Sequence, residues 1–416
     1  MTTHAAVSLE VARRLWLDAQ RLSAPAASAA EAVRSSGWWH SAGGATVPLA
    51  MAARGVAIAD AVAVEVDHEE LLEVPGVRRS MFLVPREDAG VALAASVRST
   101  RDLIAGAWRA AGGTARDAAT LKNAILEELA EVPLSVSTLA NRVPPRAVRK
   151  TGSDGGALGL PSTVHLALRE LQHEGRIVRV PRERRLDSDR YLWKHASIAT
   201  LALDDAALDQ ELAGRVVRWA GPATLKEIAW WAGITQRAAR SALEALGSEM
   251  VEVENWTTRA FVQPDRLDRA PAAAGGVVLL PFRDNFLTLR RGLAPLLSPG
   301  TMQARLLDWR GKPAAAGTLD ALHHGAIVVR GLIAGIWEFD PDARGVAWRL
   351  LADEGPPPRT VARAVRAVER LIRDELGDAR FYPFDSGPSR RARIDDARGN
   401  TTTRPPSPPR TRRAAP

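Results

Sequence analysis

The feature that most constrains this chain is an order of elements that recurs three times along it. Each copy reads as short amphipathic helices followed by two strands that a polar tip joins. The middle copy is the clearest: helices are predicted over 121–129, 135–140 and 162–173, and strands over 176–180 and 191–193. Gly175 ends its third helix, because glycine readily adopts the left-handed conformation that closes a helix.

A second copy follows near 208–263, and a looser one lies at the N-terminus. The later copy predicts helices over 212–220, 224–232 and 235–246 and strands over 250–253 and 260–262. In the N-terminal copy a last helix over Asp60–Glu70 leads into strands over 71–74 and 79–84, joined around Pro75-Gly76. Three helices and a hairpin are the order of a winged helix, a relative of the helix-turn-helix.

The rest of the chain differs from these copies. Residues 277–280, 326–329 and 335–339 read as buried strands, and 360–376 reads as an amphipathic helix. We therefore expect a helix-rich α+β protein of tandem winged-helix modules with a C-terminal α/β domain. The expected divisions are 1–117, 118–198 and 199–263 for the three modules, 264–385 for the C-terminal domain and 386–416 for a disordered Arg- and Pro-rich tail.

Composition excludes several classes of protein. The chain has no cysteine, no P-loop, no G-x-S-x-G motif and no apolar run near the ~18 residues that span a membrane. The adjacent His323 and His324 have poor geometry for one metal ion. We therefore expect a cytoplasmic protein with no membrane partner, no metal and no cofactor. The tail holds eight arginines and two aspartates, hence +6 of the total charge of +8, so net charge alone does not indicate nucleic acid.

Local placement of polar side chains points to double-stranded DNA as the partner. In a helix-turn-helix the second helix enters the major groove, and flanking loops hold the phosphates. The expected contacts are Thr163, Arg169 and Gln172 on the middle module's third helix, Arg182, Arg184, Arg185 and Arg190 at its hairpin tip, and Gln236, Arg237 and Arg240 on the last module. Winged helices also serve as protein-interaction modules, and that alternative stays open.

Four segments, in this order, resemble one family, the bacterial winged-helix DNA glycosylases of the crosslink-repair and azinomycin-resistance type (AlkZ/YcaQ-like). Residues 7–22 look like its opening helix, and Leu83-Val84-Pro85-Arg86-Glu87-Asp88 looks like its strand-to-helix step. Residues 221–233 are similar to its last helix-turn-helix, and 279–284 to its "L-L-P…D" segment. The resemblance covers roughly 7–380 and implies tandem winged helices around a duplex, with excision of alkylated or crosslinked purines.

The resemblance also implies where the chemistry lies. The family's Q-x-Q or Q-x-D motif falls at His40-Ser41-Ala42, where His40 can hold a water but Ala42 offers no amide or carboxylate. The family's R-G-T-x-H reads Arg78-Arg79-Ser80-Met81-Phe82, with Arg78 kept as a DNA contact. We take His40 and Asp88 as candidate catalytic residues, with a helix N-cap as the alternative for Asp88. A working glycosylase and a non-enzymatic DNA-binding regulator both remain open.

Overall fold

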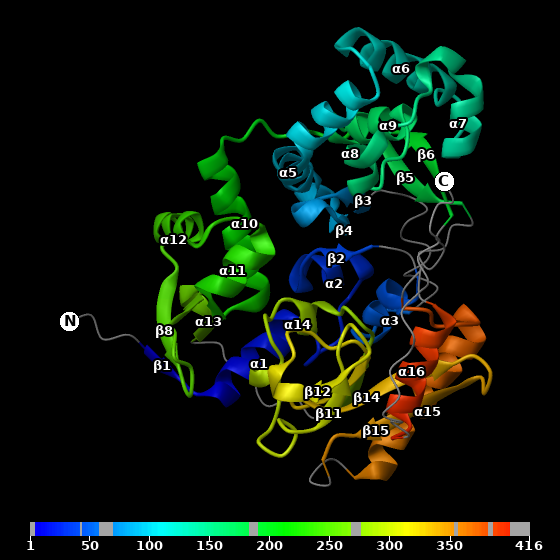
Figure 1. Ribbon diagram of the computed structural model, residues 1–416. Coiled ribbons are helices and arrows are strands. Elements are labelled where there is room, and N and C mark those ends of the chain that lie inside the picture. Colours follow the sequence, from blue (N-terminus) through cyan, green and yellow to red (C-terminus); the bar gives the residue numbers. More distant parts are fainter. Residues whose placement is uncertain are drawn as a thin grey trace. The chain divides into compact units, whose positions relative to one another are not determined.

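A computed structural model of the chain shows a helix-rich α+β protein (Figure 1). It divides into two compact units, Met1–Ala274 and Gly275–Pro416. The structure describes residues 5–41, 44–57, 70–182, 190–267, 276–352, 357–381 and 386–399. Among them, no helix is both long enough and apolar enough to cross a membrane.

The first part of the N-terminal unit places helices around a small sheet of order β2-β4-β3. Strands β3 and β4 pair antiparallel around Gly76, so the hairpin predicted there is confirmed, whereas the helix predicted over Asp60–Glu70 falls almost entirely outside the described residues. The elements are α1 (Leu9–Ala19), α2 (Ala29–Ser36), β2 (Trp39–His40), α3 (Thr46–Ala52), β3 (Leu71–Pro75), a 3₁₀ turn (Val77–Arg79), β4 (Met81–Pro85), a 3₁₀ turn (Arg86–Asp88) and α5 (Ala89–Ala110).

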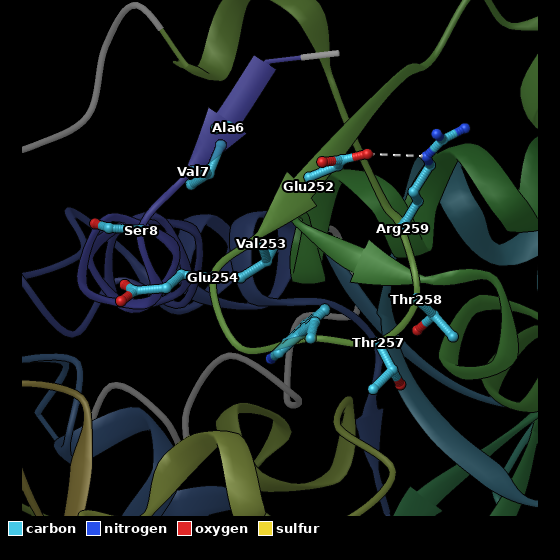
Figure 2. A pocket seen from close by; sticks show the side chains of 10 residues that line it. Ala6, Val7, Ser8, Glu252, Val253, Glu254, Thr257, Thr258 and Arg259 are labelled. Atoms are coloured by element: carbon cyan, nitrogen blue, oxygen red, sulfur yellow. Dashed lines mark hydrogen bonds and ion pairs between the residues drawn. The ribbon is translucent and has the colours of Figure 1, made fainter.

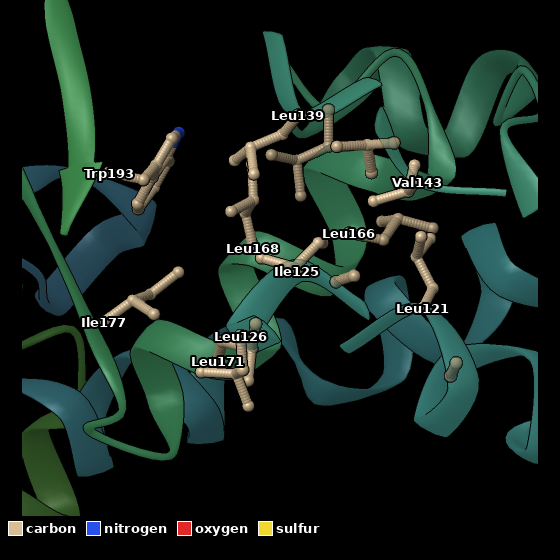
Figure 3. Packing of buried hydrophobic residues seen from close by; sticks show 14 of the residues in the cluster. Leu121, Ile125, Leu126, Leu139, Val143, Leu166, Leu168, Leu171, Ile177 and Trp193 are labelled. Atoms are coloured by element: carbon tan, nitrogen blue, oxygen red, sulfur yellow. The ribbon is translucent and has the colours of Figure 1, made fainter. Parts of the chain in front are cut away.

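The second part has the order of helices and hairpin predicted for the middle copy, with one short helix, α8 (Gly152–Ala157), added before the predicted third helix, α9 (Thr163–His173). A capping box at Thr114 begins the first helix, and the third packs its apolar side into a cluster that includes Leu121, Ile125, Leu168 and Trp193 (Figure 3). The elements are α6 (Ala115–Glu128), α7 (Val136–Arg142), a 3₁₀ turn (Pro145–Ala147), α8 (Gly152–Ala157), α9 (Thr163–His173), β5 (Ile177–Pro181) and β6 (Tyr191–His195).

The third part also confirms its predicted order. Thr224 begins the second helix with a capping box, and Gly233 ends it at a φ of 70°. The strand β1 (Ala5–Val7) adds parallel to β8, an addition that the sequence pattern did not indicate. The other elements are α10 (Asp205–Ala220), β7 (Ala223–Thr224), α11 (Leu225–Ala232), α12 (Gln236–Ala245), β8 (Glu249–Val253), β9 (Ala260–Val262) and α13 (Pro264–Leu267).

The C-terminal unit is built on an antiparallel sheet of order β10-β13-β14-β15. Its buried strands and its amphipathic helix lie where the sequence predicts them. The elements are β10 (Val277–Leu280), α14 (Asn285–Thr288), a 3₁₀ turn (Ala294–Leu296), β11 (Arg305–Leu307), β12 (Pro313–Ala315), a 3₁₀ turn (Ala316–Thr318), β13 (Gly325–Val329), β14 (Leu332–Asp340), β15 (Gly345–Leu350), α15 (Pro358–Leu371), a π-helical turn (Ile372–Leu376) and α16 (Gly387–Ala397).

The expectation that 386–416 is a disordered tail is wrong for its first part, since residues 387–397 form α16. Ile394 is buried, and so are the charged Arg390, Arg393 and Asp396. Arg393 Nε donates to Glu338 Oε2 at 3.0 Å, and Arg349 Nη2 donates to Asp396 Oδ1 at 2.8 Å. The helix therefore packs on the sheet through ion pairs, and a segment poor in apolar residues gives no sequence signal for such burial.

Candidate nucleic-acid interface and catalytic site

The exposed face of α12 is the clearest candidate for a groove contact. Thr235 begins the helix, and its side chain accepts from Ala238 N at 3.1 Å. Ala239, Ala242 and Leu243 are buried on one side. The side chains predicted to face outward, Gln236, Arg237 and Arg240, are all exposed. The two arginines form no hydrogen bond or ion pair with the part of the chain that the structure describes.

Arg78 lies beside the turn between α11 and α12. It is exposed, and its guanidinium lies 4.3 Å from the ring centroid of the half-buried Trp230. Arg78 and Arg79 both have left-handed backbone conformations, with φ of 53° and 61°, which cost an L-residue about 1 kcal/mol or more each. The family motif has glycine at the position of Arg79. Glycine adopts this conformation without that cost, which explains its presence in the motif.

The third helix of the middle part does not present its predicted contacts. Thr163 and Gln172 are each 1% exposed, and Thr163 Oγ1 donates to Ala147 O at 2.5 Å. Burial, with the nearby charge of Arg179, lowers the pKa of Arg169 to about 10. The prediction that these three side chains face outward is wrong, because α9 packs against α5, α6 and β5 rather than on one side only.

The hairpin after α9 keeps part of its expected role. Arg182 and Arg190 are exposed where the two strands approach the tip, and Arg182 N donates to Arg190 O at 2.8 Å. Arg184 and Arg185 lie outside the described residues. Cationic side chains therefore remain at the described base of this tip.

His40 lies at the edge of an aromatic cluster. It is half-buried on β2, and its ring meets Phe82 edge-on with centroids 5.7 Å apart. Behind this pair, Trp38, Trp219 and Trp231 contact one another at centroid distances of 5.1–5.7 Å. Since Phe82 is 2% exposed and stands where the family motif has histidine, the sheet fills that position with hydrophobic packing.

Asp88 is held by an internal network. Its carboxylate accepts from Trp38 Nε1 at 2.7 Å and from Arg215 Nη2 at 2.7 Å. Burial works to lower the pKa of Arg215, but the hydrogen bonds and charges of Asp88 and Glu211 together outweigh it and raise that pKa. Asp88 occupies the N-cap position of α5, but its side chain makes no capping hydrogen bond. Its contacts are those of a group that fixes α5 to its neighbours.

A carboxylate that the sequence pattern did not single out lies beside Ser41. Glu73 on β3 is 7% exposed and accepts from Ser41 Oγ at 2.6 Å and from Arg179 Nε at 2.9 Å. Arg179 also lies 4.5 Å over the Tyr191 ring. The network thus joins Ser41, the residue after His40, to the middle hairpin through Glu73. A single acidic residue inside the apolar run 71–75 is the signal that could have found it.

One hollow in the N-terminal unit suits nucleic acid poorly. It lies where β1 meets β8, and Figure 2 shows Glu252 and Glu254 on its lining, with Glu252 paired to Arg259 at 3.3 Å. The arginine of this lining, Arg259, is already paired with Glu252, and Glu254 adds a further carboxylate, so the hollow suits a phosphate poorly. Within the described ranges, no cluster of three or more His, Asp or Glu side chains could hold a metal ion.

Two comparisons with known proteins find a match. The DNA glycosylase AlkZ-like family matches residues 42–376. Among solved structures the fold resembles the DNA glycosylase AlkZ of Streptomyces sahachiroi, with a TM-score of 0.61 and 18% identity over 91% of this chain and 99% of that one. At that identity the structural match shows the fold alone. No curated protein sequence matches the chain.

Proposed function

Because the chain belongs to the AlkZ-like DNA glycosylase family, we propose that it binds duplex DNA through winged-helix modules and excises alkylated or crosslinked purines from it. The observation that carries the proposal is the exposed face of α12, where Arg237 and Arg240 have no described protein partner and Arg78 lies beside the preceding turn. Guanidinium groups without a described protein partner, on the second helix of a helix-turn-helix, suit phosphates and guanine edges. Its place of action would be the nucleoid.

The excision step asks little of the protein. Alkylation at N7 or N3 gives the purine a positive charge, so it leaves as a neutral base when the C1′–N bond breaks. The enzyme stabilises the developing oxocarbenium sugar and holds the water that attacks C1′. We assign the water to His40, the half-buried imidazole at the edge of the aromatic cluster. Asp88, with its carboxylate on Arg215 and Trp38, supports the fold beneath it.

A second candidate function rests on the altered motif. Ala42 cannot hold a water, and Phe82 packs where the family has histidine. A chain with these two replacements fits a DNA-binding regulator that retains the fold without excision. A winged-helix protein-interaction scaffold is the remaining class, and it predicts no affinity for DNA.

One assay separates the three. The protein is incubated with a duplex that carries N7-alkylguanine, and abasic sites are then cleaved with alkali. A glycosylase gives strand breaks that His40→Ala abolishes and that the matched control His195→Ala, an exposed histidine at the base of the middle hairpin, leaves unchanged. Binding without breaks supports the regulator, and absence of binding at low salt supports the scaffold.

A binding measurement tests the α12 contact itself. Arg237→Ala/Arg240→Ala should weaken binding to an undamaged duplex and lower the slope of log affinity against log salt by about 2, since each lost phosphate contact removes about 0.9. An unchanged slope with wild-type affinity would show that α12 does not contact phosphates.

A further inference from the structure

The helix α15 in the C-terminal unit carries arginines along one side. Val361 and Val365 are buried where the helix packs on β10 and β15. Arg359, Arg363, Arg366 and Arg370 are all exposed. At 100° per residue, their spacing of four, three and four residues places them within an arc of about 60°. They form one line on the side away from the buried valines, and we call this line the α15 arginine stripe.

Helix stability does not explain the stripe. The first turn has no acidic residue, and Arg359 lies there, where the positive end of the helix dipole disfavours a cation. Arg359 and Arg363, like Arg366 and Arg370, are four residues apart, and such like-charged pairs destabilise a helix. Only Arg370, in the last turn, lies where the helix dipole favours a cation, so the stripe as a whole is not placed to stabilise α15.

No described carboxylate neutralises the stripe. Its four arginines make no hydrogen bond or ion pair with the described residues. The one acidic residue of the helix, Glu369, accepts from Val346 N at 3.0 Å and pairs with Arg373 at 3.4 Å, so it is already engaged elsewhere. The stripe thus presents concentrated positive charge to a partner outside the unit.

We propose that the α15 arginine stripe binds the phosphate backbone of duplex DNA. At 1.5 Å per residue the stripe is about 16 Å long. One DNA strand carries a charge every ~3.4 Å along the axis and winds around that axis, so a straight stripe of this length can contact a few successive phosphates of one strand. A linear polyanion relieves the repulsion along the whole line at once, and four guanidinium groups suit phosphate oxygens.

The same helix is a poor match for an anionic membrane. Amphipathic helices bind membranes by inserting a face of large apolar side chains among the lipids. The apolar side of α15 is made mainly of alanine and valine, and two of its three valines, Val361 and Val365, are already buried within the unit. The charge of the α15 arginine stripe is therefore the feature that a partner would recognise. The inference rests on the proposed function only in taking duplex DNA as that partner.

The test is binding of an undamaged 30-base-pair duplex by fluorescence anisotropy at several salt concentrations. R363Q/R366Q/R370Q should weaken binding about tenfold or more at ~0.1 M salt and lower the salt slope by about 2 to 3. R363K/R366K/R370K keeps the charge and should keep the slope. The dispersed control R101Q/R109Q/R330Q removes the same charge from exposed arginines elsewhere and should change binding much less.

Each other outcome has a definite meaning. If the wild type binds and R363Q/R366Q/R370Q binds with the same affinity and slope, the inference fails and the proposed function stands. An equal loss in the dispersed control also overturns it, because net charge would then be the cause. Binding of the stripe to anionic vesicles but not to DNA assigns it to membranes instead. A wild type that binds no DNA overturns the proposed function and this inference together.

Discussion

At the scale of single residues, the Asp88–Arg215 ion pair determines whether Asp88 has a structural or a catalytic role near His40. Their side chains are 15% and 12% exposed, and Trp38 donates to the same carboxylate. Removing one partner of such a pair leaves the other charge in a poorly solvated place. Asp88 therefore matters to folding whether or not DNA is present.

We predict that Asp88→Asn lowers the free energy of unfolding by about 2 kcal/mol, because the amide still accepts from Trp38 but no longer neutralises Arg215. Urea denaturation checks this value. Asp88→Asn/Arg215→Gln should recover part of the loss, since the uncompensated guanidinium is gone. Wild-type stability together with complete loss of excision would instead make Asp88 a catalytic residue.

The outcome for single residues shows where sequence patterns have limits. Arg237 and Arg169 both lie opposite an apolar stripe on a helix, and only Arg237 is exposed. A pattern reports the face turned to a helix's nearest neighbour, whereas α9 has further neighbours from distant parts of the chain. The Glu73–Arg179 pair, 106 residues apart in sequence, was beyond such reasoning for the same reason.

At the scale of elements, local signals were sufficient for most helices and strands. Helix α11 begins at the capping box of Thr224 and ends at the left-handed turn of Gly233. Both signals can be recognised in the sequence. The strand β1 and the helix α16 were not predicted, because neither forms through an apolar pattern of its own. β1 depends on the edge of β8, and α16 depends on charged partners in the sheet.

The ion pair that holds α16 gives a prediction. Arg393→Ala leaves Glu338, which is fully buried, without this guanidinium and should cost about 3 kcal/mol or more of stability in the C-terminal unit. Arg393→Met/Glu338→Met should lose less than either single change. As a control, Arg373→Ala breaks a partly exposed pair with Glu369 and should cost about 1 kcal/mol or less. Thermal denaturation measures these variants, and equal losses for Arg393→Ala and Arg373→Ala would refute the role given to α16.

At the scale of the whole molecule, each unit holds a histidine that burial keeps neutral. Burial, helped by Arg169, lowers the pKa of His173 to about 3. Burial, with the nearby charge of His324, lowers the pKa of His323 to about 4. An unfolded histidine titrates near ~6.5. Between about pH 4 and 6.5 the unfolded chain therefore binds more protons than the folded one, so acid favours unfolding of both units.

We predict that stability is at its full value above about pH 6.5 and falls as the pH drops toward 4, by about 1.4 kcal/mol per pH unit for each histidine. Pulse proteolysis in urea, read from peptides of each unit, follows the two separately. His173→Gln should flatten the decline in the N-terminal unit alone, since glutamine can keep the hydrogen bond to Ser96 Oγ. His323→Gln should reduce it in the C-terminal unit alone, where burial also lowers the pKa of His324 and so keeps part of the decline, and the exposed His195→Gln should change neither. A decline that persists in full in both units of His173→Gln/His323→Gln would place the acid sensitivity in other groups, because the two imidazoles would no longer be there to take up protons.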